Sequence, residues 1–399
     1  MVNTDSTKIS QLLTRGVENV YPNRDFLAKL LASGKRLTLY TGYDPTASTL
    51  HIGHAITLLK LREFQDLGHK IIMLIGDFTG MIGDQTDKGA TRQQLTRAQV
   101  MANCKEYKKQ ASAILDFGGK NPAELKYNSK WLAKLSFADV LELASHFSVQ
   151  RMLERDMFQD RMEQDRPIYI HEFLYPVMQA YDSVFMDVDG EIGGNDQTFN
   201  MLAGRDLMKS LKNKEKFVLT TKLLTDSGGR KMGKSEGNMV ALSASAQDMF
   251  GGIMSWSDEL IINGFVLCTR LTEEEIKRME QDLKSGVNPR DLKAKLAFEI
   301  TKIYYGEVAA QKAQQEFDKV FRQKGLPEDI RKVKLAGTYK LVDLVAATGL
   351  ASSKSEARRL IDQKAIKIDG KVKTNWQEEI EVARGMTGQA GPRNFIKFD

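Results

Sequence analysis

A strand, a helix and a second strand are predicted between residues 36 and 76, and this unit restricts the fold more than any other feature. The segment reads RLTLYTGYDPT, then ASTLHIGHAITLLKLREFQDLGHK, then IIMLIG. Apolar residues recur at helical spacing in its middle part, at Ile52, Ala55, Ile56 and Leu59. Such a βαβ unit implies a parallel sheet with helices on its faces, and ligands then bind beyond the carboxyl ends of the strands.

The chain is long enough for several domains, because 399 residues exceed what one hydrophobic core usually supports. Patterning predicts an α/β, Rossmann-like catalytic domain over residues 1–225, with a helical insertion at about 85–165. A helical domain is expected at 226–324. A linker is expected at 325–336, followed by a small α+β domain at 337–399.

Composition excludes several classes of protein. Hydrophobic residues make up 42% and charged residues 28% of the chain, as in ordinary globular proteins. Two cysteines, Cys104 and Cys268, are too few for a zinc cluster or a disulfide framework. The first residues lack the pattern of a signal or transit peptide, and no stretch approaches a membrane-spanning length. We therefore expect a cytoplasmic protein with no membrane contact.

The positive charge is concentrated at the C-terminal end. Residues 331–399 contain 14 Lys and Arg against 8 Asp and Glu, a net charge of +6, whereas residues 1–330 balance at 44 against 44. Phosphate contacts from Lys and Arg supply most sequence-independent affinity for nucleic acids, so this segment is predicted to meet a polyanion. A solvated charged surface explains the charge equally well.

The same segment carries two local signals. Ser353 and Glu356 have capping-box spacing ahead of a helix that displays three basic residues, Lys354, Arg358 and Arg359. Asp369-Gly370 predicts a tight hairpin. A basic helix beside a hairpin suits contact with an RNA backbone, and a capping module without a ligand is the alternative.

The motif His51-Ile-Gly-His54 stands where the first strand of the βαβ unit leads into its helix. Two histidines three residues apart share one face at a helix N-terminus, where backbone N–H groups and the helix dipole favour phosphate. They could donate hydrogen bonds to a triphosphate, and Gly53 would let a base approach the backbone. The alternative is that the histidines are structural.

A second motif, Lys231-Met-Gly-Lys-Ser235, follows a glycine-rich stretch far downstream. Lysines flanked by glycines on a loop form a mobile cationic arm that can reach a triphosphate when the loop closes. Taken alone, the motif fits a basic surface turn better.

Together the two motifs resemble the paired signature of class I aminoacyl-tRNA synthetases, and their surroundings resemble the tyrosyl-tRNA synthetases of bacteria. Four segments carry this closer resemblance in the order of the chain: Tyr40–Thr46, Gly80–Asp84, Tyr175–Asp182 and Gly193–Gln197. The tail from about residue 337 resembles the S4-type RNA-binding domain. The third motif residue, Gly233, departs from the usual serine, which removes one hydroxyl contact and makes the loop more mobile.

The resemblance implies a reaction and a set of partners. ATP activates L-tyrosine to tyrosyl-adenylate, and the tyrosyl group passes to the 3' end of tRNA(Tyr). Mg²⁺ is expected with ATP, held mostly by phosphates and water, and no zinc is expected. The resemblance also implies a homodimer whose interface lies near residues 115–165.

Residue roles are implied by the same resemblance. Tyr40 and Asp182 are expected to bind the phenol hydroxyl of tyrosine. Its ammonium group is expected to be held by Asp84, Tyr175 and Gln179. Gln197 is expected to contact tyrosine from the substrate loop. Contacts to ATP or the adenylate are expected from Gly42, Asp44, Gly53, Gly194, Asp196, Met232, Lys234 and Ser235. Stabilisation of the transition state is expected from Thr46, His51, His54, Lys231 and Lys234. No general base is needed, because the tyrosine carboxylate is already ionised.

The spacing of the tyrosine-binding residues fits one helix. Tyr175, Gln179 and Asp182 follow an i, i+4, i+7 pattern, which places them on one side. Pro176 predicts that this helix begins there, because proline favours the first turn.

Four other functions compete. Tryptophanyl-tRNA synthetases share both motifs but need no partner for a phenol hydroxyl, which Tyr40 and Asp182 would supply. A cytidylyltransferase-like enzyme would not require the tyrosine helix or the basic tail. A dinucleotide dehydrogenase lacks support because no GxGxxG opens the first helix. An inactive RNA-binding protein would not need the histidines and lysines of the two motifs.

Overall fold

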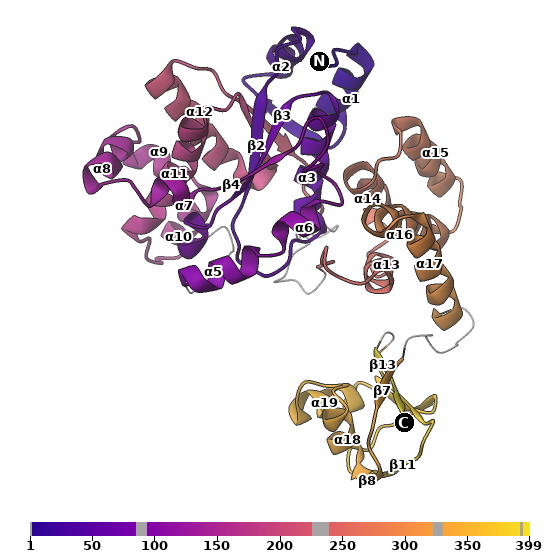
Figure 1. Ribbon diagram of the computed structural model, residues 1–399. Helices are drawn as coiled ribbons and strands as arrows, with labels where there is room; N and C mark the ends of the chain where they lie inside the picture. Colours follow the sequence, from indigo (N-terminus) through magenta and orange to yellow (C-terminus); the bar gives the residue numbers. More distant parts are fainter. Residues whose placement is uncertain (1, 85–93, 226–238, 322–329, 392–393) are drawn as a thin grey trace. The chain divides into compact units, whose positions relative to one another are not determined.

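A computed structural model describes residues 2–84, 94–225, 239–321, 330–391 and 394–399 (Figure 1). The chain divides into two compact units, Met1–Gln311 and Lys312–Asp399. The α/β fold class predicted from the sequence is confirmed: parallel strands and many helices form the first unit, and helices with small sheets form the second.

The first unit is organised by a six-stranded sheet with the order β1-β6-β5-β2-β3-β4. The strands are β1 Val17–Tyr21, β2 Thr38–Tyr43, β3 Lys70–Ile75, β4 Glu124–Tyr127, β5 Gly190–Gly194 and β6 Phe217–Thr221. All neighbouring pairs are parallel except β1 with β6. The chain leaves β2 toward β3 and β4 on one side and returns to β5 and β6 on the other. The carboxyl ends of β2 and β5 therefore form a topological switch point, where such sheets bind ligands.

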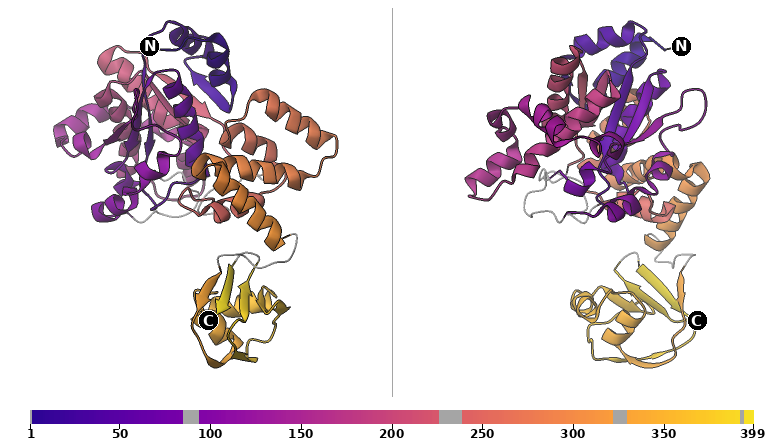
Figure 2. Two further views of the ribbon diagram at one scale, coloured as in Figure 1. Left: turned by 45° about the vertical axis from the view of Figure 1, so that its right-hand side comes forward. Right: turned by 60° about the vertical axis from the view of Figure 1, so that its left-hand side comes forward.

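Helices cover both faces of this sheet (Figure 2). One face packs against α3 Ile52–Asp66, the helix of the predicted βαβ unit. The other face is covered by α12 Thr198–Lys212, which packs along α11 Ile170–Met186. Strand β6 is buried along its whole length, as expected for a strand with helices on both sides. Helices α1 Ser6–Thr14 and α2 Arg24–Ala32 flank β1 in the sequence.

Two expectations about the region before α11 are wrong. The insertion at about 85–165 is not wholly helical, because β4 lies within it and pairs with β3. Strand β4 is short and half-buried, so it carries little periodic signal. Helix α11 begins at Ile170 and contains Pro176, which therefore does not mark its start.

The other elements described between β3 and α11 are helices: α4 Thr79–Ile82, α5 Arg97–Cys104, α6 Tyr107–Ala111, α7 Ser129–Leu132, α8 Phe137–Ser145, α9 Val149–Leu153 and α10 Asp156–Glu163.

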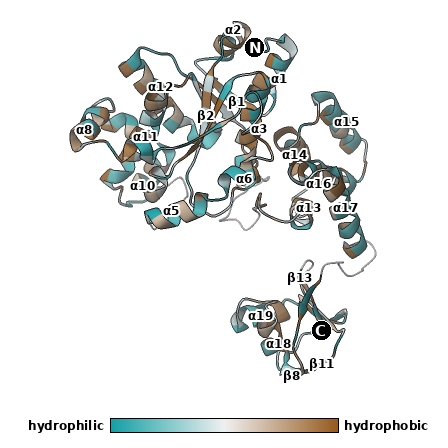
Figure 3. Ribbon diagram, in the orientation of Figure 1, coloured by the Kyte–Doolittle hydropathy of each residue, from teal (hydrophilic) through white to brown (hydrophobic). Residues whose placement is uncertain are grey.

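Helices follow the sheet in the first unit. They are α13 Ala246–Met254, α14 Leu260–Cys268, α15 Glu273–Lys284, α16 Pro289–Tyr305 and α17 Glu307–Phe321, which crosses into the second unit. Helix α14 is strongly hydrophobic (Figure 3). The Arg15 guanidinium donates to the carbonyls of Thr269 and Leu271, both at 2.5 Å, just beyond the end of α14. A cation there also interacts favourably with the helix dipole, so Arg15 fastens α14 to the N-terminal segment.

The second unit has its own hydrophobic core. Its sheet has the order β10-β9-β12-β13-β7, and β11 pairs with β8. The elements are β7 Arg331–Val333, β8 Gly337–Lys340, α18 Leu341–Ala347, α19 Lys354–Asp362, β9 Ile366–Ile368, β10 Lys371–Val372, β11 Glu379–Val382, β12 Thr387–Ala390 and β13 Asn394–Phe398. The predicted hairpin is confirmed, since β9 and β10 pair across Asp369-Gly370. The segment 325–336 was expected to be a linker, but it contains strand β7. This strand pairs with β13 and so belongs to the sheet of the second unit.

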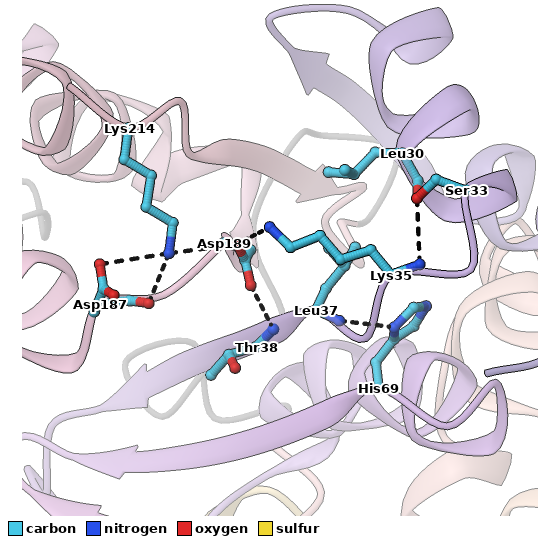
Figure 4. A network of polar contacts seen from close by, with 9 residues as sticks. All are labelled: Leu30, Ser33, Lys35, Leu37, Thr38, His69, Asp187, Asp189 and Lys214. Carbon is cyan, nitrogen blue, oxygen red and sulfur yellow. Dashed lines mark hydrogen bonds and ion pairs between the residues drawn. The ribbon is translucent and has the colours of Figure 1, made fainter. Parts of the chain in front are cut away.

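Polar contacts fix the start of β2, at the edge of the sheet opposite to its carboxyl ends (Figure 4). The Asp189 carboxylate accepts from the Thr38 backbone N–H at 2.9 Å and pairs with Lys35 at 3.1 Å. His69 Nδ1 accepts from the Leu37 backbone N–H at 3.2 Å. Because Asp189 directly precedes β5, these contacts hold β2 and β5 in register below the switch point.

Candidate active site

The carboxyl ends of three neighbouring strands gather most of the residues that the sequence singled out. Strand β2 leads into Asp44 and Thr46, β3 leads into Asp84, and β5 leads into the short 3₁₀ helix η1 Asn195–Gln197. Helix α11 adds Tyr175, Gln179 and Asp182 beside them. The structure therefore assembles the expected tyrosine-binding set from four separate segments.

Asp44 connects the strand ends to α11. Its Oδ1 accepts from Thr79 Oγ1 at 2.7 Å, and its Oδ2 accepts from the Tyr175 hydroxyl at 2.8 Å. Burial, and then the Asp44 charge, raise the pKa of Tyr175 well above its usual value. Gly76 makes this approach possible, because a Cβ there would overlap with Asp44 Oδ1 and Thr79 Oγ1. Asp44, which is expected to contact ATP, is thus hydrogen-bonded directly to Tyr175, which is expected to contact tyrosine.

Asp182 is a buried carboxyl group with two donors that sequence reasoning missed. Trp131 Nε1 donates to Oδ1 at 2.7 Å, and Asn128 Nδ2 donates to Oδ2 at 3.2 Å. Burial raises the pKa of Asp182 well above its usual value, while these two hydrogen bonds lower it. The donors come from α7 and the residue before it, a segment without a recognisable motif.

Tyr40 lies in the same buried region as Asp182. Its ring packs in a core cluster with Trp131, the partner of Asp182. Its hydroxyl is 2.9 Å from Ser183 Oγ. Burial raises the pKa of Tyr40 well above its usual value, and the charges of Glu191 and Asp182 add to the rise. The two residues expected at the substrate hydroxyl therefore lie close enough to interact.

Asp84 is held by three side chains. Arg155 Nη2 donates to Oδ1 at 2.5 Å, Asn200 Nδ2 donates to Oδ2 at 2.9 Å, and Gln197 Nε2 approaches Oδ2 at 3.4 Å. Only Gln197 was singled out in the sequence. Arg155 lies in the helical insertion, where one more arginine among many charged residues gave no signal. Gln179 completes the set, donating from Nε2 to Glu191 Oε1 at 3.0 Å.

His51 and His54 form the N-terminal cap of α3. Their rings stack with centroids 3.7 Å apart, and the His51 backbone N–H donates to His54 Nδ1 at 3.2 Å. Burial lowers the pKa of His51 to about 4, and burial followed by the charge of His51 lowers the pKa of His54 well below its usual value. The lowered pKa values favour the neutral form of both rings, which suits them to donate hydrogen bonds at a helix N-terminus.

The chain that follows the second motif runs beside the first. The Ile52 backbone N–H donates to the Val240 carbonyl at 3.0 Å, and the Leu242 N–H donates to the Leu50 carbonyl at 2.9 Å. The expected residues Lys231, Met232, Lys234 and Ser235 themselves lie outside the described residues. Because the bridge partner of His51 is Ala241, the chain described after the second motif lies directly against the histidine motif.

The remaining expected nucleotide contacts line the strand ends. Gly42 lies in β2 and Gly53 in the first turn of α3. The Thr46 backbone N–H donates to the Asp44 carbonyl at 2.8 Å, which shapes the loop before α3. Gly194 ends β5, where a Cβ would lie 2.5 Å from Asp196 Oδ1. In the described part of the chain, no group of His, Cys, Asp or Glu side chains is arranged to hold a metal ion.

The three basic residues expected at RNA lie on α19 in the second unit. Lys354 pairs with Asp343 at 2.7 Å, and the Arg358 guanidinium lies 4.8 Å from the centroid of the Trp376 ring. Arg359 is largely exposed. Ser353 caps the helix by accepting from the Glu356 backbone N–H at 3.2 Å, as predicted, but the capping box is incomplete because the Glu356 carboxylate accepts from the Ser352 backbone N–H at 2.8 Å. None of the helices in the described ranges has the length and apolar composition to span a membrane.

Comparisons with known proteins match this arrangement. The family of tRNA synthetases class I (W and Y) matches residues 32–322, and the S4 domain matches residues 340–378. A tyrosine--tRNA ligase of Moorella thermoacetica is 45% identical over 97% of this chain and 95% of its own length. One of Thermotoga maritima is 42% identical over 97% and 96%. A truncated mitochondrial tyrosyl-tRNA synthetase of Coccidioides posadasii superimposes with a TM-score of 0.62 at 27% identity, over 77% of this chain and 91% of that one.

Proposed function

Because this chain belongs to the class I tRNA synthetases of the tryptophan and tyrosine type, with near full-length tyrosine--tRNA ligase relatives, we propose how its residues divide the work of tyrosine activation and tRNA charging. ATP is the second substrate of activation. The chemistry joins a carboxylate oxygen of tyrosine to the α-phosphorus of ATP and breaks the α–β phosphoanhydride bond, so pyrophosphate leaves. The tyrosyl group then passes to a ribose hydroxyl of tRNA, and AMP leaves.

Tyr40 and Asp182 recognise the phenol hydroxyl of tyrosine, and Asp84, Tyr175 and Gln179 hold its ammonium group, with Gln197 supporting Asp84. The observation that carries this assignment is the buried Asp182 carboxyl group with its donors Trp131 and Asn128. A buried polar group that loses a partner costs free energy. Tyrosine offers such a partner to Asp182, whereas phenylalanine and tryptophan have no hydroxyl.

The nucleotide is bound where β2 and β5 end. Asp44, Gly42, Gly53, Gly194 and Asp196 contact ATP or the adenylate, together with Met232, Lys234 and Ser235. Thr46, His51, His54, Lys231 and Lys234 stabilise charge on the transferring phosphoryl group. Mg²⁺ bound together with ATP would neutralise phosphate charge, and phosphate oxygens and water would supply most of its ligands. The enzyme works in the cytoplasm, where its tRNA substrate is charged.

His51→Asn is expected to lower kcat for tyrosine-dependent exchange of pyrophosphate into ATP by about 10-fold, with the KM for tyrosine within about 2-fold of wild type. Asparagine is a favourable N-cap residue, so α3 keeps its start, but the shorter side chain loses the reach of the imidazole. His146→Asn is the matched control, because the His146 ring contacts Ser210 Oγ at 3.0 Å and belongs to no part of the proposed site. An unchanged kcat would remove His51 from the transition state.

The second unit binds tRNA through α19. Its S4 match includes Lys354, Arg358 and Arg359, and the net charge of +6 in residues 331–399 suits an RNA backbone. The proposed contacts are electrostatic, so tRNA charging should weaken with rising salt while adenylate formation changes little.

The chain forms a homodimer through an interface near residues 115–165 that extends to the start of α11. Large apolar side chains are exposed there: Phe137 by 78%, Leu141 by 56%, Val149 by 64% and Ile170 by 83%. These residues come from α8, α9 and the start of α11, and α8 packs on α11. Large apolar side chains exposed on neighbouring parts of the chain indicate an interaction surface, and a second copy of the chain is the proposed partner.

Phe137→Glu is expected to weaken dimer association by at least about 10-fold. The substitution replaces an aromatic side chain that would be buried in the proposed dimer interface by a charged one. Analytical ultracentrifugation at micromolar concentration measures the change. Val308→Glu is the control, since Val308 is also an exposed apolar residue but lies on α17. A wild-type monomer at micromolar concentration would contradict the proposal.

A further inference from the structure

A fully buried lysine lies behind the residues proposed to recognise tyrosine. The side chain of Lys216, just before β6, is 0% exposed, and its ion-pair partner Glu191 in β5 is 3% exposed. Lys216 Nζ also donates to Ser183 Oγ at 2.9 Å. Burying two charges is costly, and a buried pair often contributes little to stability. The pair therefore calls for an explanation beyond the stability of the fold.

The pair reaches two recognition residues, Tyr40 and Gln179. From Lys216 the contact passes through Ser183 Oγ to the Tyr40 hydroxyl, 2.9 Å away. From Glu191 it passes directly to Gln179 Nε2 at 3.0 Å. Nothing in the proposed chemistry of the ATP site uses either member of the pair.

The space for this arrangement is provided by a glycine of α12. A Cβ on Gly204 would lie 2.6 Å from Lys216 Nζ and 2.9 Å from Ser183 Oγ. Both distances are too short for a real Cβ contact, so a larger residue would displace the ammonium group from the serine. Gly204 thus allows α12 to pack closely against Lys216 and Ser183.

The lysine favours one direction for the hydrogen bond between Ser183 and Tyr40. An ammonium group only donates, so Ser183 Oγ uses one lone pair to accept from Lys216, and its single hydroxyl hydrogen is available to be donated to Tyr40. Accepting from a cation polarises the serine hydroxyl and strengthens it as a donor. When Ser183 donates to Tyr40, the Tyr40 hydrogen points away from the serine and can be donated to a substrate.

We propose that Lys216, paired with Glu191, is a positioning residue that orients the Tyr40 hydroxyl as a donor to the substrate's phenol oxygen. The hydrogen bonds then run in one direction, from Lys216 through Ser183 and Tyr40 to the substrate, whose own hydroxyl donates to Asp182. The inference rests on the proposed role of Tyr40 and Asp182. It adds a reason why a substrate without a hydroxyl is rejected, because such a substrate leaves the oriented Tyr40 donor without an acceptor.

The test compares tyrosine with phenylalanine in pyrophosphate exchange for two variants. Ser183→Ala cuts the chain of hydrogen bonds between Lys216 and Tyr40. The double variant Lys216→Met with Glu191→Gln removes both charges together, and the amide carbonyl that it introduces in β5 can still accept from Gln179. Each is expected to lower kcat/KM for tyrosine about 10-fold without lowering the value for phenylalanine, so the tyrosine preference falls by at least about 10-fold.

A control separates positioning from general stability. Lys60 is another buried lysine, paired with Glu63 at 2.6 Å on α3 and bonded to the Leu12 carbonyl at 2.9 Å. Lys60→Met is expected to lower thermal stability without changing the tyrosine preference. If the double variant does not fold, Ser183→Ala decides the question alone.

The outcomes distinguish this inference from the function on which it rests. A wild-type enzyme that prefers tyrosine, together with a Ser183→Ala variant that keeps the full preference, would overturn the positioning role only. A wild-type enzyme without tyrosine preference would overturn the proposed recognition site itself. A loss of preference in Lys60→Met equal to that in Ser183→Ala would also overturn the inference, because the effect would then be general.

Discussion

Replacing Asp182 by asparagine is expected to lower kcat/KM for tyrosine about 100-fold in pyrophosphate exchange, while the value for phenylalanine changes by less than about 3-fold. The substitution keeps the shape of the side chain. Its amide nitrogen, however, is a donor where Asp182 accepts from Asn128 or from the substrate hydroxyl, so at least one buried partner is lost. Leaving a buried polar partner unsatisfied costs about 1 to 3 kcal/mol, which accounts for the size of the effect.

Asp77→Asn is the matched control for this prediction. Asp77 is also buried, and its carboxylate accepts from the Ser129 backbone N–H at 2.9 Å and from Ser129 Oγ at 2.5 Å. We expect this variant to lose stability but to keep the wild-type ratio of tyrosine to phenylalanine. If Asp182→Asn kept that ratio as well, Asp182 would have no part in recognising the hydroxyl.

Ending the chain after Phe321 is expected to reduce tRNA charging on the order of 100-fold and to leave tyrosine-dependent pyrophosphate exchange within about 2-fold of wild type. The cut removes β7 together with β13, its partner, so no half-sheet is left exposed. It also removes the net +6 charge of residues 331–399. The residues proposed to bind tyrosine and ATP all lie in the first unit, Met1–Gln311.

A milder variant checks that this loss reflects RNA contact. Replacing Lys354, Arg358 and Arg359 by glutamine keeps the second unit but removes three of its cations, and the salt dependence of tRNA charging should become shallower. Lys371→Gln in the hairpin is a single-charge comparison. If the truncated enzyme lost both activities to the same degree, the proposed separation of activation from tRNA binding would be wrong.

Local patterns predicted the parts of this enzyme that depend on short stretches of sequence. The βαβ unit, the histidine motif at the start of α3 and the Asp369-Gly370 hairpin are each encoded within a few turns or strands. The order of the motifs along the chain was enough to identify the family and its reaction. The fold class followed from the same unit.

Contacts between distant segments could not be predicted in this way. Trp131 reaches Asp182 across 51 positions, and Arg155 reaches Asp84 across 71. Such partners carry no periodicity and resemble any other tryptophan or arginine in a helical stretch. Strands β4 and β7 escaped prediction for a related reason, because each is short, partly exposed and defined only by its pairing with a distant strand.

Pro176 shows how tertiary packing overrides a local preference. Helix α11 continues through this residue although proline lacks a backbone N–H, because the helix is packed along α12 and Pro176 itself is buried. Tyr169 and Glu172 instead supply the N-terminal cap. Proline does favour the first turn of a helix, but the packing of α11 on α12 allows this helix to begin six residues earlier, at Ile170.

The amino-acid dependence of pyrophosphate exchange tests the central claim most directly. A slot that recognises an aromatic hydroxyl through Tyr40 and Asp182 predicts rapid exchange with tyrosine and, at equal concentrations, far slower exchange with phenylalanine and tryptophan. Comparable exchange with phenylalanine, or faster exchange with tryptophan, would contradict the account.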